Sequence, residues 1–230
     1  MESLGSPLRI FVAGATGVIG RALVPLLLRA GHAVTGTTRS PARAEVLARS
    51  GANPVIVDVY DGVALCQAVE RARPDVVIHQ LTDLPDQMTA EERGAALERN
   101  ARMRVAGTNN LMVAAVAAGV GRVVAQSIAF AYAPGPLPHR EDAPLLPGLS
   151  ADGVRALEAA VTSTDGVAGL VLRYGRLYGP GTWTSVPEGT SPLHVDAAAQ
   201  AALLAVHRGG SGIYNIAEDA DGEEIGRAHV

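Results

Sequence analysis

"FVAGATGVIGRAL", residues 11–23, places three glycines between a short apolar run and a run with helical spacing. A strand followed by a glycine-rich turn and a helix is typical of a dinucleotide-binding site. The first glycine allows a tight turn, the second lets the backbone approach the pyrophosphate, and the third allows close helix packing. The free N–H groups at the helix N-terminus favour phosphate. The stretch therefore predicts a cofactor-binding loop formed by Gly14, Thr16, Gly17, Val18, Ile19 and Gly20.

Apolar, β-branched runs alternate with runs of helical spacing along the rest of the chain. Strands are predicted at residues 8–13, 33–38, 54–57, 75–81, 122–125, 169–172 and 212–216, and helices at 18–29, 41–49, 62–72, 90–118, 151–162 and 196–206. The strand runs are continuously apolar, which is typical of parallel strands buried on both faces. Gly31 after the first helix and the spacing of Thr89 and Glu92 are helix-capping signals. The pattern predicts an α/β fold with a Rossmann-like doubly wound parallel sheet.

Composition limits the class of protein. A chain of 230 residues is most simply one domain, and its core must be aliphatic because aromatic residues make up only 3 %. A net charge of −4 without a basic run argues against a nucleic acid partner, and no apolar stretch predicts a signal peptide or a membrane span. Cys66 is the single cysteine, which suits a reducing cytoplasm, and no spacing predicts a metal site. We expect a cytoplasmic protein, and its oligomeric state stays open.

The end of the second predicted strand indicates which dinucleotide binds. An NAD site is expected to place Asp or Glu here, as an acceptor for the ribose 2′-hydroxyl. This chain has Arg39, with Ser40 and Arg43 close by. A guanidinium binds a 2′-phosphate bidentately, whereas a carboxylate would repel it. The sequence therefore predicts NADP(H) as the cofactor and residues 1–230 as a single NADP-binding domain.

With these residues in place, the chain resembles the extended short-chain dehydrogenase/reductases of the NAD-dependent epimerase/dehydratase group. The similar segments are "GATGVIG" (14–20), "VDVYD" (57–61), "VVIHQLT" (76–82), "RVAGTNNLMVAA" (104–115) and "LRYGRLYGPGTW" (172–183). The resemblance implies that Asp58 meets the adenine amino group and that Val59 flanks the adenine ring. It also implies that Gln80, Leu81 and Thr82 pass under the cofactor.

The catalytic residues depart from the family pattern. The family's Tyr and Lys lie four residues apart, with the Tyr as acid/base and the Lys lowering its pKa. This chain contains no lysine. Counting back from Glu158 puts Ser150 and Val154 at the two positions, and the family's usual Asn in the long helix is Arg104 here. The resemblance therefore implies an atypical member.

Few protic side chains are left as candidates for catalysis. The family's Ser or Thr falls at Ile128, with Ser127 one place earlier. Ser127 and Tyr132 are the catalytic candidates, and Tyr174 and His139 are further protic groups near the expected nicotinamide. For each of them a purely structural role stays open. Two arginines, at positions 173 and 176, could bind substrate or pair with core carboxylates.

The region that would bind substrate looks reduced. Loops are predicted at residues 133–149, which are rich in proline, and at 179–194, and both are expected to act as substrate lids. Only ten residues separate Trp183 from His194, where many relatives insert helices that hold a nucleotide-sugar. A nucleotide-sugar substrate is therefore not expected.

These departures suggest what chemistry remains. Hydride transfer belongs to the cofactor, and a positioned acid adds only about 10²–10⁴-fold. Loss of the acid would slow reduction least for a substrate that protonates its own developing alkoxide. An aromatic polyketide with a phenol beside its ketone is such a substrate. The pattern resembles the small atypical ketoreductases of polyketide antibiotic pathways. It implies an NADPH-dependent ketoreductase of a flat, largely apolar carbonyl substrate such as an angucyclinone, with substrate-assisted protonation.

Two other functions stay open at this point. A non-catalytic NADP-binding regulator or partner subunit would also lack the Tyr and Lys. A lyase or isomerase on the same scaffold would use the cofactor without net redox change.

Overall fold

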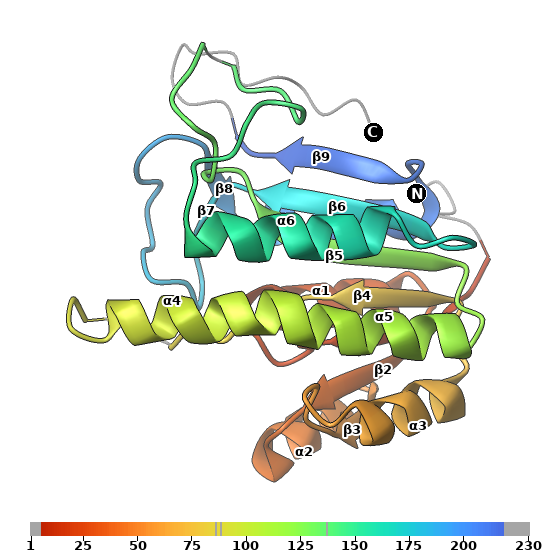
Figure 1. Cartoon of the computed structure of the whole chain (residues 1–230). Coiled ribbons are helices and arrows are strands. Elements are labelled where there is room, and N and C mark those ends of the chain that lie inside the picture. The colour runs from red at the N-terminus through yellow and green to blue at the C-terminus, as the bar shows by residue number, and fades with distance from the viewer. Residues whose placement is uncertain (1–5, 86, 88, 137, 219–230) are drawn as a thin grey trace.

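The computed structural model describes residues 6–85, 87, 89–136 and 138–218, and it is an open sheet with helices on both faces (Figure 1). In chain order the elements are β1 (Arg9–Ala13), α1 (Val18–Arg29), β2 (Ala33–Thr38), α2 (Pro41–Arg49), β3 (Asn53–Ile56), α3 (Gly62–Ala72), β4 (Val76–His79), α4 (Arg93–Arg102), η1 (Met103–Gly107), α5 (Thr108–Ala117), β5 (Arg122–Ile128), α6 (Leu149–Thr162), β6 (Ala168–Tyr174), β7 (Arg176–Tyr178), β8 (Pro192–His194), α7 (Val195–His207) and β9 (Gly212–Ile216).

The main sheet has seven strands in the order β3-β2-β1-β4-β5-β6-β9, and all neighbouring pairs are parallel. β1 lies between β2 and β4, with Ile10 opposite Val34 on one side and Val76 on the other. The chain winds outward from β1 in both directions, so the carboxyl ends of β1 and β4 flank the point where ligands bind in such sheets. The predicted doubly wound parallel sheet is confirmed.

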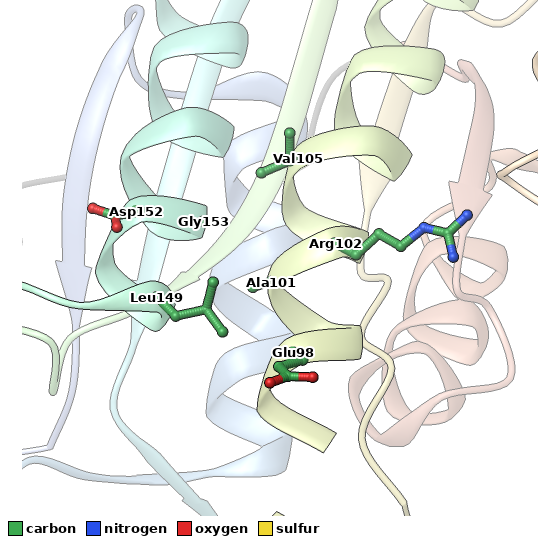
Figure 2. Close-up of a pocket in the computed structure, with 7 residues that line it drawn as sticks. All are labelled: Glu98, Ala101, Arg102, Val105, Leu149, Asp152 and Gly153. Atoms are coloured by element: carbon green, nitrogen blue, oxygen red, sulfur yellow. The ribbon is translucent and has the colours of Figure 1, made fainter. Parts of the chain in front are cut away.

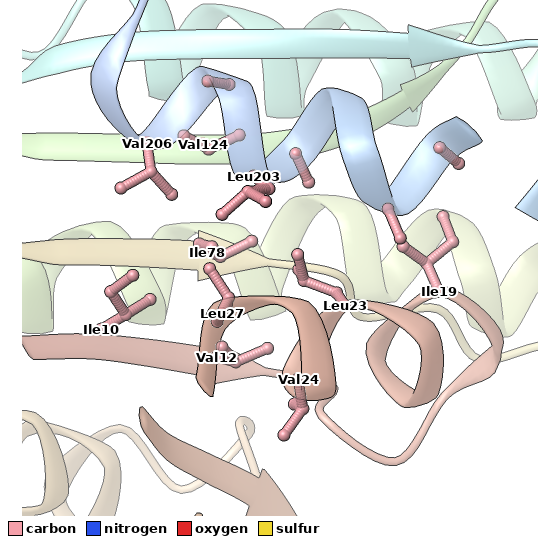
Figure 3. Packing of buried hydrophobic residues seen from close by; sticks show 14 of the residues in the cluster. Ile10, Val12, Ile19, Leu23, Val24, Leu27, Ile78, Val124, Leu203 and Val206 are labelled. Carbon is pink, nitrogen blue, oxygen red and sulfur yellow. The ribbon is translucent and has the colours of Figure 1, made fainter. Parts of the chain in front are cut away.

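One face of the sheet is covered mainly by α1 and α7. Figure 3 shows Leu23 and Leu27 of α1 and Leu203 of α7 packed over Ile78 of β4. All four side chains are buried. Burying a side chain of this size stabilises the fold by about 1.5–3 kcal/mol. This layer fixes the first helix, and with it the glycine loop, against the sheet.

The other face is covered by α3, α5 and α6, which lie in front of the sheet in Figure 1. Phe11 is the one buried phenylalanine of this layer, and it packs with Leu65, Leu111 and Leu157, one from each helix. The layer is otherwise built from Val, Ala, Leu and Met. A core of aliphatic residues was predicted from the low aromatic content.

The long helix predicted over residues 90–118 is interrupted. α4 and α5 are joined without a turn by η1, a π-helical segment of five residues. A π segment inserts one wider turn and commonly marks a functional position. Met103, Arg104 and Gly107 of this segment are buried. The register of the helix therefore shifts just where the chain carries a buried arginine.

A second, small sheet was not predicted. β7 and β8 pair in parallel, with Leu177 opposite Leu193. The predicted lid loop at residues 179–194 therefore ends in a strand rather than in loop structure, because Leu193 is buried in the core. The Gly31 prediction is confirmed, since Gly31 has φ +88° after α1. Thr89 and Glu92 exchange the expected hydrogen bonds, but in the turn before α4, whose N-cap is Glu92.

Candidate active site at the carboxyl edge of the sheet

The glycine loop joins β1 to α1 at the switch point of the sheet. Gly14 has φ +89°, and a Cβ there would lie 2.7 Å from the carbonyl oxygen of Gln80. A Cβ at Gly20 would overlap the carbonyl oxygen of Gly14. Two of the three glycines are thus required by the protein's own backbone, one for a left-handed turn and one for close packing.

Gly17 is different, because little in the protein opposes a side chain there. It is the N-cap of α1 with φ −74°, and an added Cβ would meet only the carbonyl oxygen of Gly14, at 3.3 Å. Thr16, Val18 and Ile19 flank it, and the first N–H groups of a helix have no intrahelical partner. The open space above Gly17 and these donors fit the phosphates of a dinucleotide.

The end of β2 borders the loop through hydroxyl groups. Thr37 Oγ1 accepts a hydrogen bond from the N–H of Gly14 at 3.2 Å, and Thr38 Oγ1 accepts one from the N–H of Ser40. Ser40 caps α2 by accepting from the N–H of Arg43. Arg39 lies between these residues with an exposed side chain. The guanidinium can therefore reach a ligand lying along the end of β2.

The end of β3 forms the next wall. Val59 is buried, and its carbonyl oxygen accepts a hydrogen bond from the Asn110 side chain at 2.9 Å. Asp58 is exposed and holds the turn by accepting from the N–H of Tyr60 at 3.0 Å. Arg102 lies over the Tyr60 ring, 4.6 Å from its centroid. An apolar side chain beside a free carboxylate suits an adenine ring with an exocyclic amine.

The end of β4 offers an unsatisfied acceptor. Gln80 is buried, and its Oε1 is the only buried side-chain polar atom in the described part of the chain without a hydrogen-bond partner. Leu81 and Thr82 follow it along the edge, and Gln126 donates to the carbonyl oxygen of Leu81 at 3.1 Å. An orphaned buried acceptor is costly in a folded protein. The hydroxyl and amide donors of a nicotinamide dinucleotide fit this place.

Residues 10–213 match the NAD dependent epimerase/dehydratase family. The chain belongs to that family. It is 44 % identical to the 3-diazoavenalumate denitrifying reductase of a Streptomyces species, over 92 % of this chain and 76 % of the relative. It is 33 % identical to the dTDP-4-dehydrorhamnose reductase of Streptomyces griseus, over 75 % of this chain and 51 % of that relative. Membership supports an enzyme of oxidoreductase or epimerase type with a nicotinamide dinucleotide cofactor.

Solved structures share the fold of this epimerase/dehydratase family member. The Bordetella bronchiseptica enzyme WbmG in complex with NAD superposes with a TM-score of 0.75 at 23 % identity, covering 93 % of this chain and 73 % of that one. The UDP-glucose 4-epimerase of Thermotoga maritima gives 0.76 at 21 % identity, covering 90 % and 76 %. The predicted fold and the predicted resemblance to this family are confirmed.

α6 carries Ser150 and Val154, the two residues that the sequence is expected to place at the family's acid/base positions. Ser150 is half-buried in the first turn of that helix, and Val154 is buried in a small apolar cluster with Leu145 and Ala151. An apolar cluster with a valine at its centre leaves no ammonium group on this helix. The positive charge that α6 does carry, Arg155, pairs with Asp152 at 2.9 Å and donates to the carbonyl oxygen of Leu145.

Ser127 belongs to a buried ion-pair network. Its Oγ donates to Glu158 Oε1 at 2.8 Å. Arg173 clamps the same carboxylate with two hydrogen bonds, at 2.7 Å from Nε and 2.6 Å from Nη2. Burial alone would lower the pKa of Arg173, but the hydrogen bonds and charge of Glu158 raise it above the ordinary value. The network pins α6 to β5 and β6.

Tyr132 extends this network toward the proline-rich loop. Its hydroxyl donates to Asn215 Oδ1 at 2.7 Å and accepts from Arg173 Nη1 at 2.7 Å. Burial raises the pKa of Tyr132. Its ring stacks on His139, with centroids 4.9 Å apart. Tyr174 is fully buried, and burial raises its pKa also. Both catalytic candidates, Ser127 and Tyr132, thus have their hydroxyl hydrogens committed within the protein.

Two further surfaces border the candidate site. Trp183, in the β7–β8 loop, donates from Nε1 to the carbonyl oxygen of Pro85 at 3.2 Å and so ties that loop to the segment after β4.

A separate open groove of about 330 Å³ lies between α4 and α6 (Figure 2). It contains none of the strand ends, and its lining is Glu98, Ala101, Arg102, Val105, Leu149, Asp152 and Gly153.

Within the described ranges, no group of three or more His, Cys, Asp and Glu side chains could hold a metal ion. No described helix is both long and apolar enough to cross a bilayer. Pairing with a core carboxylate was one of the two roles left open for Arg173, and Glu158 is that carboxylate. The identity of Glu158 and the part of Ser127 were not predicted; the available signal was a lone glutamate on the apolar face of a predicted helix.

Proposed function

We propose that this protein is an NADPH-dependent reductase that acts on a substrate needing no proton from a protein side chain. The observation that carries the proposal is the commitment of both candidate hydroxyls. Ser127 donates to Glu158 and Tyr132 donates to Asn215. The expected alignment of Ser150 and Val154 with the family's acid/base pair supports the same proposal. Neither candidate hydroxyl then has a free hydrogen with which to protonate a developing alkoxide.

The cofactor assignment rests on the edge residues. The glycine loop binds the pyrophosphate, Asp58 and Val59 bind the adenine, and Gln80, Leu81 and Thr82 border the nicotinamide half. Arg39 binds the 2′-phosphate that distinguishes NADP(H) from NAD(H). When bound, the reduced nicotinamide supplies the hydride, and the protein's part is to hold and align the two reactants, which can be worth more than a general acid.

An aromatic ketone with a neighbouring phenol is the first candidate substrate. Its phenol donates the proton as the carbonyl oxygen gains charge, so the protein's missing acid costs little. A flat polyketide such as an angucyclinone has this arrangement. The short β7–β8 loop and the proline-rich loop at residues 133–149 would act as lids over such a substrate.

A diazo compound is the second candidate, favoured by the 44 % identity to a reductase named for the denitrifying reduction of 3-diazoavenalumate. An aryl diazonium group would accept the hydride at its terminal nitrogen to give an aryl diazene, as NADPH is oxidised to NADP⁺. The diazene would then lose N₂: its C–N bond breaks, and its N–H hydrogen passes to the ring carbon to form the C–H bond. No alkoxide forms in this sequence. The absence of a general acid is therefore consistent with this substrate as well.

The test is NADPH oxidation with three substrates: an aromatic ketone carrying an ortho phenol, its phenol methyl ether, and an arenediazonium salt. The ketone mechanism predicts turnover of the free phenol and loss of most of the rate for the methyl ether. The diazo mechanism predicts release of N₂ in equal amount to NADPH consumed, above a protein-free blank. Turnover of none of the three, with NADPH bound, would leave the non-catalytic alternative.

The protein's own hydroxyls provide the second arm of this test. Ser127→Ala and Tyr132→Phe should each lower turnover by less than about 10²-fold, the lower limit for a true general acid. If either variant binds NADPH normally but is inactive, that hydroxyl is the acid and the proposed mechanism fails.

A further inference from the structure

Arg104 is a buried arginine whose guanidinium no described residue satisfies. It lies in the π-helical segment η1 and is 8 % exposed. Among the described residues, no side chain or carbonyl accepts a hydrogen bond from it, and no carboxylate lies within ion-pair distance. The other buried arginine, Arg173, has a bidentate carboxylate. Both arginines are therefore buried, but only Arg173 has a counter-ion among the described residues.

The nearest buried carboxylate cannot serve both arginines. Glu158 Oε1 already accepts from Ser127 and from Arg173, and Oε2 accepts from Arg173. Glu158 is the only buried acidic residue in the described part of the chain, against two buried arginines. The site therefore carries one uncompensated positive charge. Gln80 Oε1 is the only fully enclosed polar side-chain atom without a partner in the described part of the chain, so the Arg104 nitrogens keep some contact with solvent. A mostly buried charge without a counter-ion is costly, and such groups gather at functional sites.

The place of Arg104 is the carboxyl edge of the sheet. Thr108, one turn after Arg104 in the continuous η1–α5 helix, contacts Nε2 of His79, the last residue of β4, at 2.9 Å. The charge of Arg104 also lowers the pKa of His79. His79 directly precedes Gln80, whose Oε1 is the unsatisfied acceptor. Burial lowers the pKa of Arg104, and Glu158 opposes that change. A cation without a counter-ion among the described residues and a buried acceptor without a donor thus belong to the same region of the fold.

We infer that Arg104 binds a negatively charged oxygen group of the substrate, a carboxylate or a phenolate. The inference rests on the proposed function, since it assigns a substrate class to the same site. A guanidinium presents paired N–H donors that match two oxygens of a carboxylate, and in a desolvated site such a pair is strong. An anion there would also compensate the extra buried charge.

The experiment measures binding rather than turnover, with the protein loaded with NADP⁺. Calorimetry compares benzoate with benzamide, and 4-nitrophenolate with 4-nitroanisole, so the two arms separate carboxylate from phenolate. The wild-type protein should bind one anion at least about tenfold more tightly than its neutral counterpart. Arg104→Met should remove that preference. Arg99→Met, which changes an exposed arginine on α4, should keep it.

Stability distinguishes a binding role from a structural one. If Arg104 binds substrate, Arg104→Met removes an unpaired buried charge, and the melting temperature should stay level or rise. A drop in melting temperature with the anion preference intact would assign the residue to the fold and overturn the inference. Equal affinity for anion and neutral probe in the wild type would overturn it as well. Failure of NADPH to bind would instead count against the proposed function.

Discussion

We propose that a single exposed side chain, that of Arg39, decides the choice between NADP(H) and NAD(H). The backbone around it is held by Thr38 and Ser40, so substituting the side chain should not disturb the loop. The structures of WbmG and WbmH, which share this fold, were solved with NAD, so the preference of this protein needs a direct test.

We expect NADPH to bind this protein more tightly than NADH, and Arg39→Asp to erase or reverse that order, because a carboxylate would face the 2′-phosphate. Calorimetric titration of both cofactors into both proteins measures it. Arg43→Asp, on the first turn of α2, is the matched control for a simple change of surface charge. Equal affinity of the wild type for the two cofactors would show that Arg39 does not select between them.

At the scale of elements, the glycine loop separates requirements of the fold from requirements of the ligand. A side chain at Gly20 would collide with backbone, whereas one at Gly17 meets only one carbonyl oxygen. We therefore expect Gly17→Val to fold and to lose NADPH affinity, and Gly20→Ala to unfold. Circular dichroism and calorimetry together measure both outcomes. Gly94→Val, in open space on α4, should change neither.

The Glu158–Arg173 pair joins α6 to the sheet, and both side chains are nearly inaccessible, at 6 % and 4 % exposure. Glu158→Gln leaves a buried guanidinium without its partner, which typically costs about 3–5 kcal/mol. We expect a loss of that size in urea unfolding. The double variant Glu158→Leu, Arg173→Met should recover much of it, because both charges are then gone. A single variant as stable as wild type would refute the role of the pair.

The elements that sequence predicts well are those with a strong pattern. The helix at 18–29 coincides with α1, because the apolar spacing and Gly31 mark both its course and its end. η1 was missed because one wider turn barely changes the periodicity. β7 and β8 were missed because each has three residues, too few for a pattern. Short or irregular elements depend on tertiary packing rather than on local preference.

At the scale of the molecule, stability should depend on pH through a buried histidine. His79 is fully buried, accepts from the N–H of Leu81 through Nδ1 and contacts Thr108 Oγ1 through Nε2 at 2.9 Å. Burial first, and then the charge of Arg104, lower the pKa of His79 to about 4. Protonation would place a second donor against the N–H of Leu81, which explains why the neutral form is preferred.

The unfolded chain therefore binds a proton near pH 6.5 that the folded chain refuses until about pH 4. We expect stability to fall as the pH drops through this window, by about 3 kcal/mol from this residue alone. Chemical unfolding between pH 7 and 4 measures it. His79→Asn, whose side-chain oxygen can still accept from Leu81, should flatten the profile. An unchanged slope would place the effect on other groups.

The sheet order could be predicted from sequence, whereas the charged network could not. Parallel strands with helical crossovers leave few topologies, and the glycine loop fixes where ligands bind. Ser127 and Glu158 lie 31 residues apart, and Arg104 differs from Arg173 only in what surrounds it. Which buried arginine is paired is decided by the packing of whole elements, and no local pattern reports that.

The hydrogen bond between Trp183 and Pro85 makes tryptophan fluorescence a probe of the candidate site. Trp183 is the chain's single tryptophan, so all indole fluorescence comes from the β7–β8 loop where it meets the segment after β4. Reduced nicotinamide absorbs light in the range that indole emits, so a cofactor held at this edge would dim the emission by energy transfer. Closure of the loop over a substrate would further shift the emission, because the ring is 55 % exposed to water without one. Cofactor binding and loop closure can thus be followed by tryptophan fluorescence, without an added label.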